Sequence, residues 1–226
     1  MDDWIWALSA GRGLDANLAC RWACPCARRG LFPRGMSAFV LASKSPRRRA
    51  LLAALGLEPK IIPADIDERR LPHESPIPYA LRVASHKAIA GDPGDLPVVL
   101  GADTIVALDG ETLGKADDEQ HAEEMLLRLS GRTHVVHTAV ALRWRRPGRD
   151  EMLSDVVSTE VRFRAFSRED ARRYIATGDP MDKAGAYGIQ GEGGALVAEI
   201  RGSYTNVVGL PLEETLRLLR MTGVVA

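Results

Sequence analysis

The sequence predicts an α/β domain with a mixed β-sheet and flanking helices. Two observations indicate this class. Early in the chain, short apolar runs alternate with helical patterns, which favours strand–helix connections. Further on, two long strand-like stretches, 133–144 and 151–165, flank Pro147-Gly148, and this order is typical of an antiparallel hairpin. Crossover connections and a hairpin in one chain predict a sheet of mixed strand order.

The size and charge of the chain restrict its function. Its 226 residues fit one domain, or one domain with a tail. The 30 basic residues balance the 30 acidic ones, so we expect no binding to a nucleic acid polymer or an anionic membrane through a one-signed field. No stretch of about 18 residues lacks charged and turn residues, so no transmembrane helix is expected. Aromatic residues, at 5%, are too few for platforms that stack single-stranded nucleic acid.

Residues 1–35 differ in pattern from the rest of the chain. They contain all three cysteines, and they sustain neither the strand nor the helix period. Cys20, Cys24 and Cys26 raise the alternative of a metal or redox site, but C-x3-C-x-C lacks the second ligand pair of a zinc site. We therefore expect a disordered or mis-started extension, with Met36 as the biological start and 36–226 as the functional domain. Because that domain has no cysteine, it forms no internal disulfide, which suits the cytoplasm.

The functional domain begins with a strand and a helix. Residues 38–42 (AFVLA) form a short apolar run of the buried-strand type. Ser45 is a good N-cap, Pro46 suits the first helical position, and Gly56 suits the residue after a helix over 47–55. Strand, polar turn and helix in this order are typical of an α/β phosphate site.

Three consecutive arginines, Arg47 to Arg49, lie in the first turn of that helix. The helix dipole is positive there, so each cation is unfavourable by roughly 0.3–1 kcal/mol. A bound anion would remove the conflict, and the turn also contains Ser43 and Ser45. The alternative is a solvated basic face. The serine-rich turn favours the ligand.

A second strand and helix follow. Residues 60–65 (KIIPAD) predict the strand, and the proline-rich loop after it contains Glu68 and Glu74. A helix is expected over 78–90, with Lys87 on its apolar stripe. Two interpretations of this lysine remain open: its ammonium extends to solvent, or it meets an anion.

The strongest strand pattern covers 97–108 (PVVLGADTIVAL), and Asp103 and Thr104 interrupt it. An unpaired carboxylate buried in a central strand would cost several kcal/mol. The alternative, an aspartate that caps a nearby helix, is less favoured. We expect Asp103 to hold a metal ion or a water molecule, on the same side of the sheet as the arginine-led helix tip.

The Asp-Gly pair at 109–110 predicts a hairpin turn. The register that it sets places Lys115 opposite Thr104, so Lys115 shares the face of Thr104 and not that of Asp103. Because a lysine side chain is long, convergence of these side chains on one site stays open.

The rest of the chain completes the sheet and its helices. We expect helices over 117–129 and 167–177, a strand over 195–200, and a last helix from Pro211. His134 and His137 lie three apart on a strand and point to opposite faces, so no zinc site is predicted. The glycine-rich stretch 182–194 lets the backbone approach a ligand, but it matches neither a P-loop nor a dinucleotide fingerprint.

These features together point to phosphate chemistry. Lysine and arginine bind phosphates, and carboxylates hold a divalent cation in an oxygen-rich shell. No Ser-His-Asp or Cys-His pair is apparent, so we expect water as the nucleophile, activated by a metal and a carboxylate. The residues by themselves predict phosphoanhydride hydrolysis and leave the substrate open.

Six segments in uninterrupted order carry a family resemblance. They are LASKSPRRRALL (41–52), GADT (101–104), LGK (113–115), LSGRTH (129–134), DKAGAYGIQG (182–191) and GSYTNVVGLPLEET (202–215). The chain from 36 to 226 resembles the Maf family of nucleoside triphosphate pyrophosphatases. The resemblance implies cleavage between the α and β phosphates, a divalent cation (Mg²⁺ or Mn²⁺), and frequent homodimers. It also implies a mixed sheet split between two lobes around a cleft, similar to inosine triphosphatases.

The resemblance also implies roles for individual residues. Asp103 matches the proton acceptor, and Glu68 matches an acid that holds the metal together with Asp103. The positions expected to touch phosphates are Ser43, Ser45, Arg48, Lys87, Lys115 and Lys183. Arg47, Thr104 and Gln190 match positions associated with base selection, and they resemble the dTTP/UTP branch and not the 7-methyl-GTP branch. A glutamine amide offers a donor and an acceptor, which suits the N3–H and carbonyl edge of thymine or uracil.

The function implied is hydrolysis of dTTP and UTP to the monophosphate and pyrophosphate, which would prevent incorporation of modified nucleotides. One alternative is a non-catalytic nucleotide-binding regulator of cell division. Another is a purine-clearing enzyme of the inosine triphosphate pyrophosphatase type, against which Gln190 and the SPRR run argue.

Overall fold

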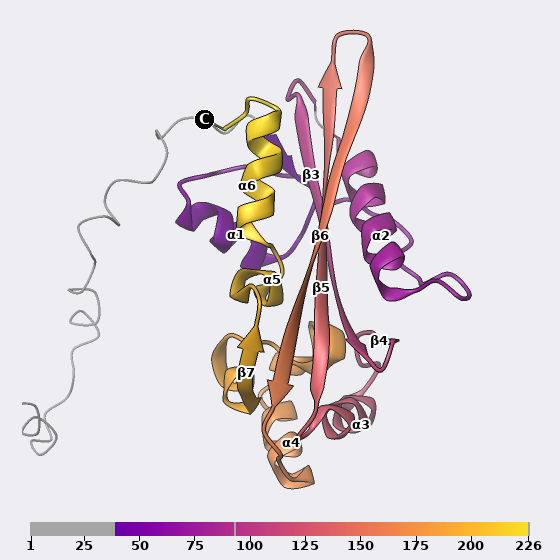
Figure 1. Cartoon of the computed structure of the whole chain (residues 1–226), viewed down its shortest axis with the longest axis vertical. Coiled ribbons are helices and arrows are strands. Elements are labelled where there is room, and N and C mark those ends of the chain that lie inside the picture. Colours follow the sequence, from indigo (N-terminus) through magenta and orange to yellow (C-terminus); the bar gives the residue numbers. More distant parts are fainter. Residues whose placement is uncertain (1–38, 93, 226) are drawn as a thin grey trace, which may run out of the picture.

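The computed structural model describes residues 39–92 and 94–225, so the N-terminal extension 1–35 lies outside the described residues. Figure 1 shows a long sheet with helices on both faces. The elements are β1 (Phe39–Leu41), α1 (Pro46–Ala54), β2 (Lys60–Ile61), α2 (Pro76–Ala90), β3 (Val98–Leu108), β4 (Glu111–Leu113), α3 (Glu119–Leu129), β5 (Thr133–Arg146), β6 (Arg149–Phe163), α4 (Arg168–Ile175), the 3-10 turns η2 (Asp179–Asp182), η3 (Ala184–Ala186) and η4 (Gly191–Leu196), β7 (Val197–Arg201), α5 (Tyr204–Val208) and α6 (Leu212–Met221).

The sheet is mixed, which confirms the predicted fold class. Its seven strands run in the order β2-β1-β3-β5-β6-β7, and β4 also pairs with β3. β1 is parallel to β2 and β3, whereas the other strand pairs described are antiparallel. Crossovers through α1 and α2 produce the parallel pairs. Tight turns join β3 to β4 and β5 to β6, while longer connections through α3 and α4 lead to β5 and β7.

Each face of β3 packs against different helices. Odd-numbered residues face α2: Ile105 packs with α2 alanines, and a Cβ on Gly101 would lie 2.2 Å from the backbone oxygen of Ala84. Even-numbered residues face the opposite side, where Leu100 packs with Leu52 of α1. Neighbouring residues of β3 therefore serve two different layers.

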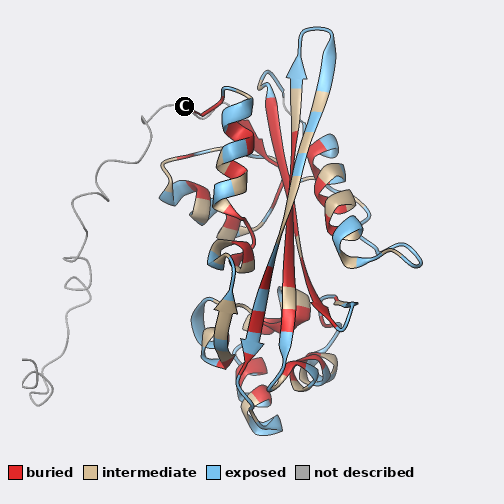
Figure 2. Cartoon of the chain, viewed as in Figure 1, coloured by how far each residue is buried: buried red, intermediate tan, exposed pale blue. Residues whose placement is uncertain are grey.

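The face opposite α2 carries two separate apolar clusters. The α1–α6 cluster contains Phe39, Leu52, Leu100, Val140, Leu142 and Leu219, and the α3–α4 cluster contains Val106, Leu126, Leu129, Val136, Phe163 and Ile175. On β3 and on β5, one threonine lies between the two clusters: Thr104 and Thr138, which are partners in register. Buried residues lie on both sides of this threonine pair, whereas the tip of the β5–β6 hairpin is exposed (Figure 2). The two clusters are the cores of two lobes that share one sheet.

Some predicted elements need correction. The strand expected over 60–65 is only Lys60–Ile61, because Pro63 cannot donate to a ladder. β4 ends at Leu113, so Lys115 is in no strand and the partner of Thr104 is Thr138 on β5. Helix α5 was not expected. The helix expected over 117–129 is Glu119–Leu129, and Asp118 is its N-cap.

The lobe built around the α3–α4 cluster contains a buried histidine, His134. We expect this histidine to lower the stability of the fold in acid. His134 is 1% exposed, its Nε2 lies 2.7 Å from the Tyr187 hydroxyl, and its Nδ1 has no partner among the described residues. Burial lowers the pKa of His134 from 6.5 to about 4. As pH falls from 6.5 to 4, His134 becomes protonated in the unfolded chain but stays neutral in the folded chain. The free energy of unfolding therefore decreases over this range. Since each pH unit in this window contributes about 1.4 kcal/mol, the total loss is roughly 3 kcal/mol.

Urea unfolding at several pH values checks this expectation. His134→Gln removes the titrating group, so its unfolding free energy should change less with pH than that of the wild type. His137, whose pKa burial also lowers, contributes in the same direction and remains in the variant. Identical slopes for the two proteins between pH 6.5 and 5 would contradict the assignment to His134.

Candidate active site

The start of α1 places one arginine inside the molecule. The Ser45 hydroxyl caps the helix by accepting a hydrogen bond from the Arg48 N–H, as the sequence predicts. The Arg48 side chain is buried and donates to Ser43 Oγ at 3.0 Å, to Thr104 Oγ1 at 3.1 Å and to the Gly209 carbonyl at 2.8 Å. Burial lowers the pKa of Arg48, and the charge of Asp103 opposes that shift. Arg48 therefore links α1, β3 and the end of α5.

The Arg48 contacts continue into a polar belt between the two lobes. Thr104 Oγ1 lies 3.0 Å from Thr138 Oγ1, and Thr138 donates to the Asn206 carbonyl at 2.8 Å. The Asn206 amide donates to Thr159 Oγ1 and to the Val136 carbonyl, and the residue is fully buried. α5 thus supplies hydrogen-bond partners to Thr138 and Thr159, while the Asn206 Oδ1 itself has no partner within the described residues.

The opposite face of β3 carries a second charged group. Lys87 of α2 is buried, and its Nζ lies 2.9 Å from Asp103 Oδ1 and 3.0 Å from Glu68 Oε1. Of the two interpretations of Lys87, contact with an anion is therefore correct, and the anions are these two carboxylates. Burial raises the pKa of the Asp103 carboxyl, while the charges of Lys87 and Arg48 act against that rise.

Asp103 and Arg48 contact opposite faces of the sheet, so the expectation of one shared side is wrong. The pleat alone dictates this, because Thr104, which binds Arg48, neighbours Asp103. Their charges nevertheless act on each other, and the sheet edge is open beside these residues. Along one edge of β3, pairing with β1 ends at Leu100 and pairing with β4 begins at Val106, with no strand described between. Asp103 and Thr104 lie at this opening.

The glycine-rich segment places a further charged group beside α1. Lys183 Nζ lies 3.0 Å from Asp179 Oδ1 and 2.6 Å from Asp182 Oδ1. Asp182 also lies 3.8 Å from Arg47, so this carboxylate joins the segment to the arginine-led helix. The Tyr174 hydroxyl fixes the segment by donating to Asp179 and accepting from the Gly188 N–H.

Two predicted site residues lie at the surface, and their side chains form no hydrogen bond or ion pair within the described residues. They are Lys115 and Gln190. The backbone next to Lys115 does meet the glycine-rich segment, because the Gly185 N–H donates to the Gly114 carbonyl at 2.9 Å. Lys115 therefore borders the segment that carries Lys183, although its ammonium binds no carboxylate there.

This arrangement suits a polyanion and a divalent cation. Each of Arg47, Lys87 and Lys183 pairs with carboxylates, whose places phosphate oxygens would take. Glu68 and Asp103 approach one ammonium, and magnesium typically uses one or two carboxylates, with phosphates and water completing the shell. No group of three or more His, Cys, Asp or Glu side chains suited to a metal occurs in the described ranges. The residues present fit a metal bound together with substrate.

Fold and site define a mixed α/β protein in which several cations lie around one buried carboxylate and further, exposed carboxylates. The model of Maf-like proteins matches residues 38–222, and this chain belongs to that family. A relative from Anaeromyxobacter dehalogenans named dTTP/UTP pyrophosphatase is 56% identical over 184 residues, covering 81% of this chain and 93% of that protein. Relatives of the same name are 54% identical in Pectobacterium atrosepticum (80% and 90% covered) and 53% identical in Escherichia coli O157:H7 (81% and 92% covered).

A solved nucleoside-triphosphatase / dITP/XTP pyrophosphatase from Mycobacterium abscessus is also similar. It is 17% identical, with 82% of this chain and 95% of that chain covered, and the TM-score is 0.42. A likeness of this size supports no conclusion about activity.

The sequence did not identify several residues of the site. Thr138, Asn206, Asp179 and Asp182 shape it through contacts between segments far apart in the chain. The run GSYTNVVG contributed only to the family resemblance. Its polar residues before an apolar helix were the available signal for α5, because Ser203 caps that helix by accepting from the Asn206 N–H.

Proposed function

We propose that this protein hydrolyses dTTP and UTP to the monophosphate and pyrophosphate. The observation that carries the proposal is the buried Asp103 carboxylate, held by Lys87 and within the field of Arg48. Relatives covering most of the chain at 53–56% identity are named for this activity. The phosphate chemistry expected from the residues agrees with the activity for which these relatives are named.

Asp103 acts as the proton acceptor in this mechanism. Burial raises the pKa of the Asp103 carboxyl and so makes its carboxylate a stronger base than an exposed aspartate, and the charges of Lys87 and Arg48 oppose that rise. Water attacks the α phosphorus and gives its proton to Asp103; the α–β phosphoanhydride bond breaks and pyrophosphate leaves. Negative charge grows on the departing group, so fixed cations at Arg48, Lys87 and Lys183 lower the barrier.

Glu68 and Asp103 would hold the divalent cation, Mg²⁺ or Mn²⁺, as carboxylate ligands. When bound, such an ion neutralises charge on the phosphate oxygens. Glu68 is exposed and belongs to the loop before α2, whereas Asp103 is fixed in β3. Glu68 on this loop would adjust its position to the ion, while Asp103 would stay fixed and Lys87 would turn towards phosphate.

The three positions associated with base selection differ in whether their side chains already have hydrogen-bond or ion-pair partners. Thr104 Oγ1 is engaged by Arg48 and Thr138, and Arg47 pairs with Asp182. In the described part of the chain, no group hydrogen bonds to the Gln190 amide. Gln190 is thus the position that offers both a donor and an acceptor to a pyrimidine edge. Ser43 accepts a hydrogen bond from Arg48, and Ser45 caps the start of α1.

A panel of nucleoside triphosphates with Mg²⁺ tests the function. Pyrophosphate should appear with dTTP and UTP, and far less with purine triphosphates. Orthophosphate as the first product, or hydrolysis limited to inosine and xanthosine triphosphates, would overturn the proposal. Nucleotide binding without turnover would instead favour the regulator of cell division, for which no observation speaks.

Further features of the proposal rest on the resemblance and on composition. We assign the protein to the cytoplasm, as a homodimer, with a role in keeping modified nucleotides out of nucleic acid and with no nucleic acid polymer as partner. The described residues include no helix long and apolar enough to cross a membrane. Sedimentation velocity tests the dimer, and modified pyrimidine triphosphates in the substrate panel test the role.

A further inference from the structure

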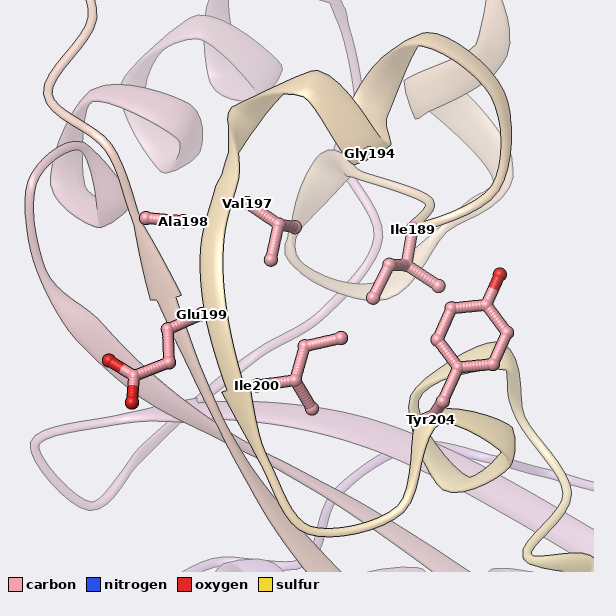
Figure 3. A pocket seen from close by; sticks show the side chains of 7 residues that line it. All are labelled: Ile189, Gly194, Val197, Ala198, Glu199, Ile200 and Tyr204. Carbon is pink, nitrogen blue, oxygen red and sulfur yellow. The ribbon is translucent and has the colours of Figure 1, made fainter. Parts of the chain in front are cut away.

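A shallow groove of about 370 Å³ lies beside the site, at the edge of the sheet. Figure 3 shows the Tyr204 ring opposite the side chains of Ile189 and Ile200, with Val197 further along the same wall. Tyr204 is 48% exposed, and in the described part of the chain its hydroxyl forms no hydrogen bond. The groove is apolar apart from Glu199, whose carboxylate points away in Figure 3 and pairs with Arg162 and Arg201.

Both walls of this groove continue directly into the proposed site. Ile189 precedes Gln190, and the Lys183 side chain passes so close to Gly188 that a Cβ there would lie 2.8 Å from Lys183 Cε. On the other wall, Tyr204 begins α5, and the Gly209 carbonyl after that helix binds Arg48. Five helical residues rise about 7.5 Å. That span is comparable to the separation of a nucleotide's base from its phosphates.

The wall with Ile189 is fixed by close backbone contacts. A Cβ on Gly193 would lie 2.2 Å from the Gly188 carbonyl oxygen, and one on Gly194 would lie 2.7 Å from the Ile189 carbonyl oxygen. The segment therefore folds back on itself where only glycine fits. Ile189 and Gln190 are held at the rim without a ligand.

We propose that this groove binds the pyrimidine ring of the nucleotide, with the base stacked on Tyr204 and covered by Ile189. This inference rests on the proposed function and adds Tyr204 as a residue that binds the base. An aromatic ring supplies stacking to any base, whereas Gln190 at the rim reads the polar edge. Tripolyphosphate, which has no base, uses the cationic site alone.

The test compares Tyr204→Ala with the wild type by calorimetric titration of α,β-imido-dTTP and of inorganic tripolyphosphate. Affinity for the dTTP analogue should fall about tenfold, as loss of one base–aromatic stack does, while affinity for tripolyphosphate stays unchanged. Tyr204→Phe keeps the ring and should bind the analogue at least fivefold more tightly than Tyr204→Ala. Met221→Ala, which removes a similarly exposed apolar side chain from the end of α6, is the control expected to bind like the wild type.

Three results would overturn the inference: unchanged affinity for the analogue, equal losses for analogue and tripolyphosphate, or a wild type that binds the two equally. A fourth is a changed oligomeric state of Tyr204→Ala with affinity intact, because β7 is an end strand and the groove would then be a contact between copies. A wild type that binds the analogue through Tyr204 but releases no pyrophosphate from dTTP would instead overturn the proposed function alone.

Discussion

Asp103→Asn lowers the turnover of dTTP and UTP at least a hundredfold. The amide has nearly the shape of the carboxylate but cannot accept the proton of the attacking water, and general base catalysis contributes about 10²–10⁴-fold. Burial raises the pKa of Asp103, so wild-type activity should rise with pH as this carboxyl loses its proton. The acid limb of the pH profile should be absent from the residual activity of the variant. Steady-state release of pyrophosphate at several pH values measures both effects.

Binding distinguishes a catalytic loss from a folding defect. Asp103→Asn should still bind α,β-imido-dTTP, because Arg48 and Lys183 do not depend on this carboxylate for their positions. Asp95→Asn, at an exposed aspartate outside the site, is the matched control and should keep full activity. Turnover by Asp103→Asn within a few-fold of the wild type would exclude Asp103 as the proton acceptor.

Gly101→Ala should cost stability and activity together. A Cβ at this buried position would lie 2.2 Å from the Ala84 carbonyl oxygen and 2.6 Å from the Ala88 nitrogen, both in the backbone of α2. Because backbone cannot rotate away, α2 must shift, at a cost of about 3 kcal/mol. For a domain of this size, that corresponds to a fall in Tm of roughly 6–12 °C. The shift also moves Lys87, whose Cβ would lie 3.1 Å from the new methyl group, away from Asp103.

Gly114→Ala provides the control, because a Cβ there meets nothing within 4 Å in the described structure. Its Tm should change by no more than about 2 °C, as for a surface substitution. Scanning calorimetry of both variants measures the difference. If Gly101→Ala melted like the wild type, α2 would not pack against β3 as closely as these distances require.

Local sequence signals predicted most of the elements. Ser45 before Pro46 predicted the start of α1, and the Ser167–Asp170 capping box at the start of α4 is present in the structure. Asp109-Gly110 predicted the hairpin register that pairs Leu108 with Glu111. These features depend on residues within a few positions of each other, so one sequence suffices to predict them.

Contacts between segments far apart in the chain could not be predicted from local sequence patterns. The Arg48 side chain reaches Gly209, 161 positions away, and nothing near either residue predicts this. The prediction that Asp103 and the tip of α1 lie on the same side of the sheet is wrong, because side chains of neighbouring strand residues point to opposite faces. The roles of the individual residues in phosphate chemistry stay predictions, and the face of the sheet that each residue occupies could be read only from the structure.

The continuity of β3 and β5 through both lobes has a consequence for how a nucleotide enters. Each strand passes through both apolar clusters, so the lobes cannot swing apart about a flexible linker without breaking main-chain ladders. We therefore expect no domain closure about a hinge. Entry should depend instead on small rearrangements in which ion-paired side chains such as Lys183 exchange protein carboxylates for phosphate, so added salt should change the rate of capture.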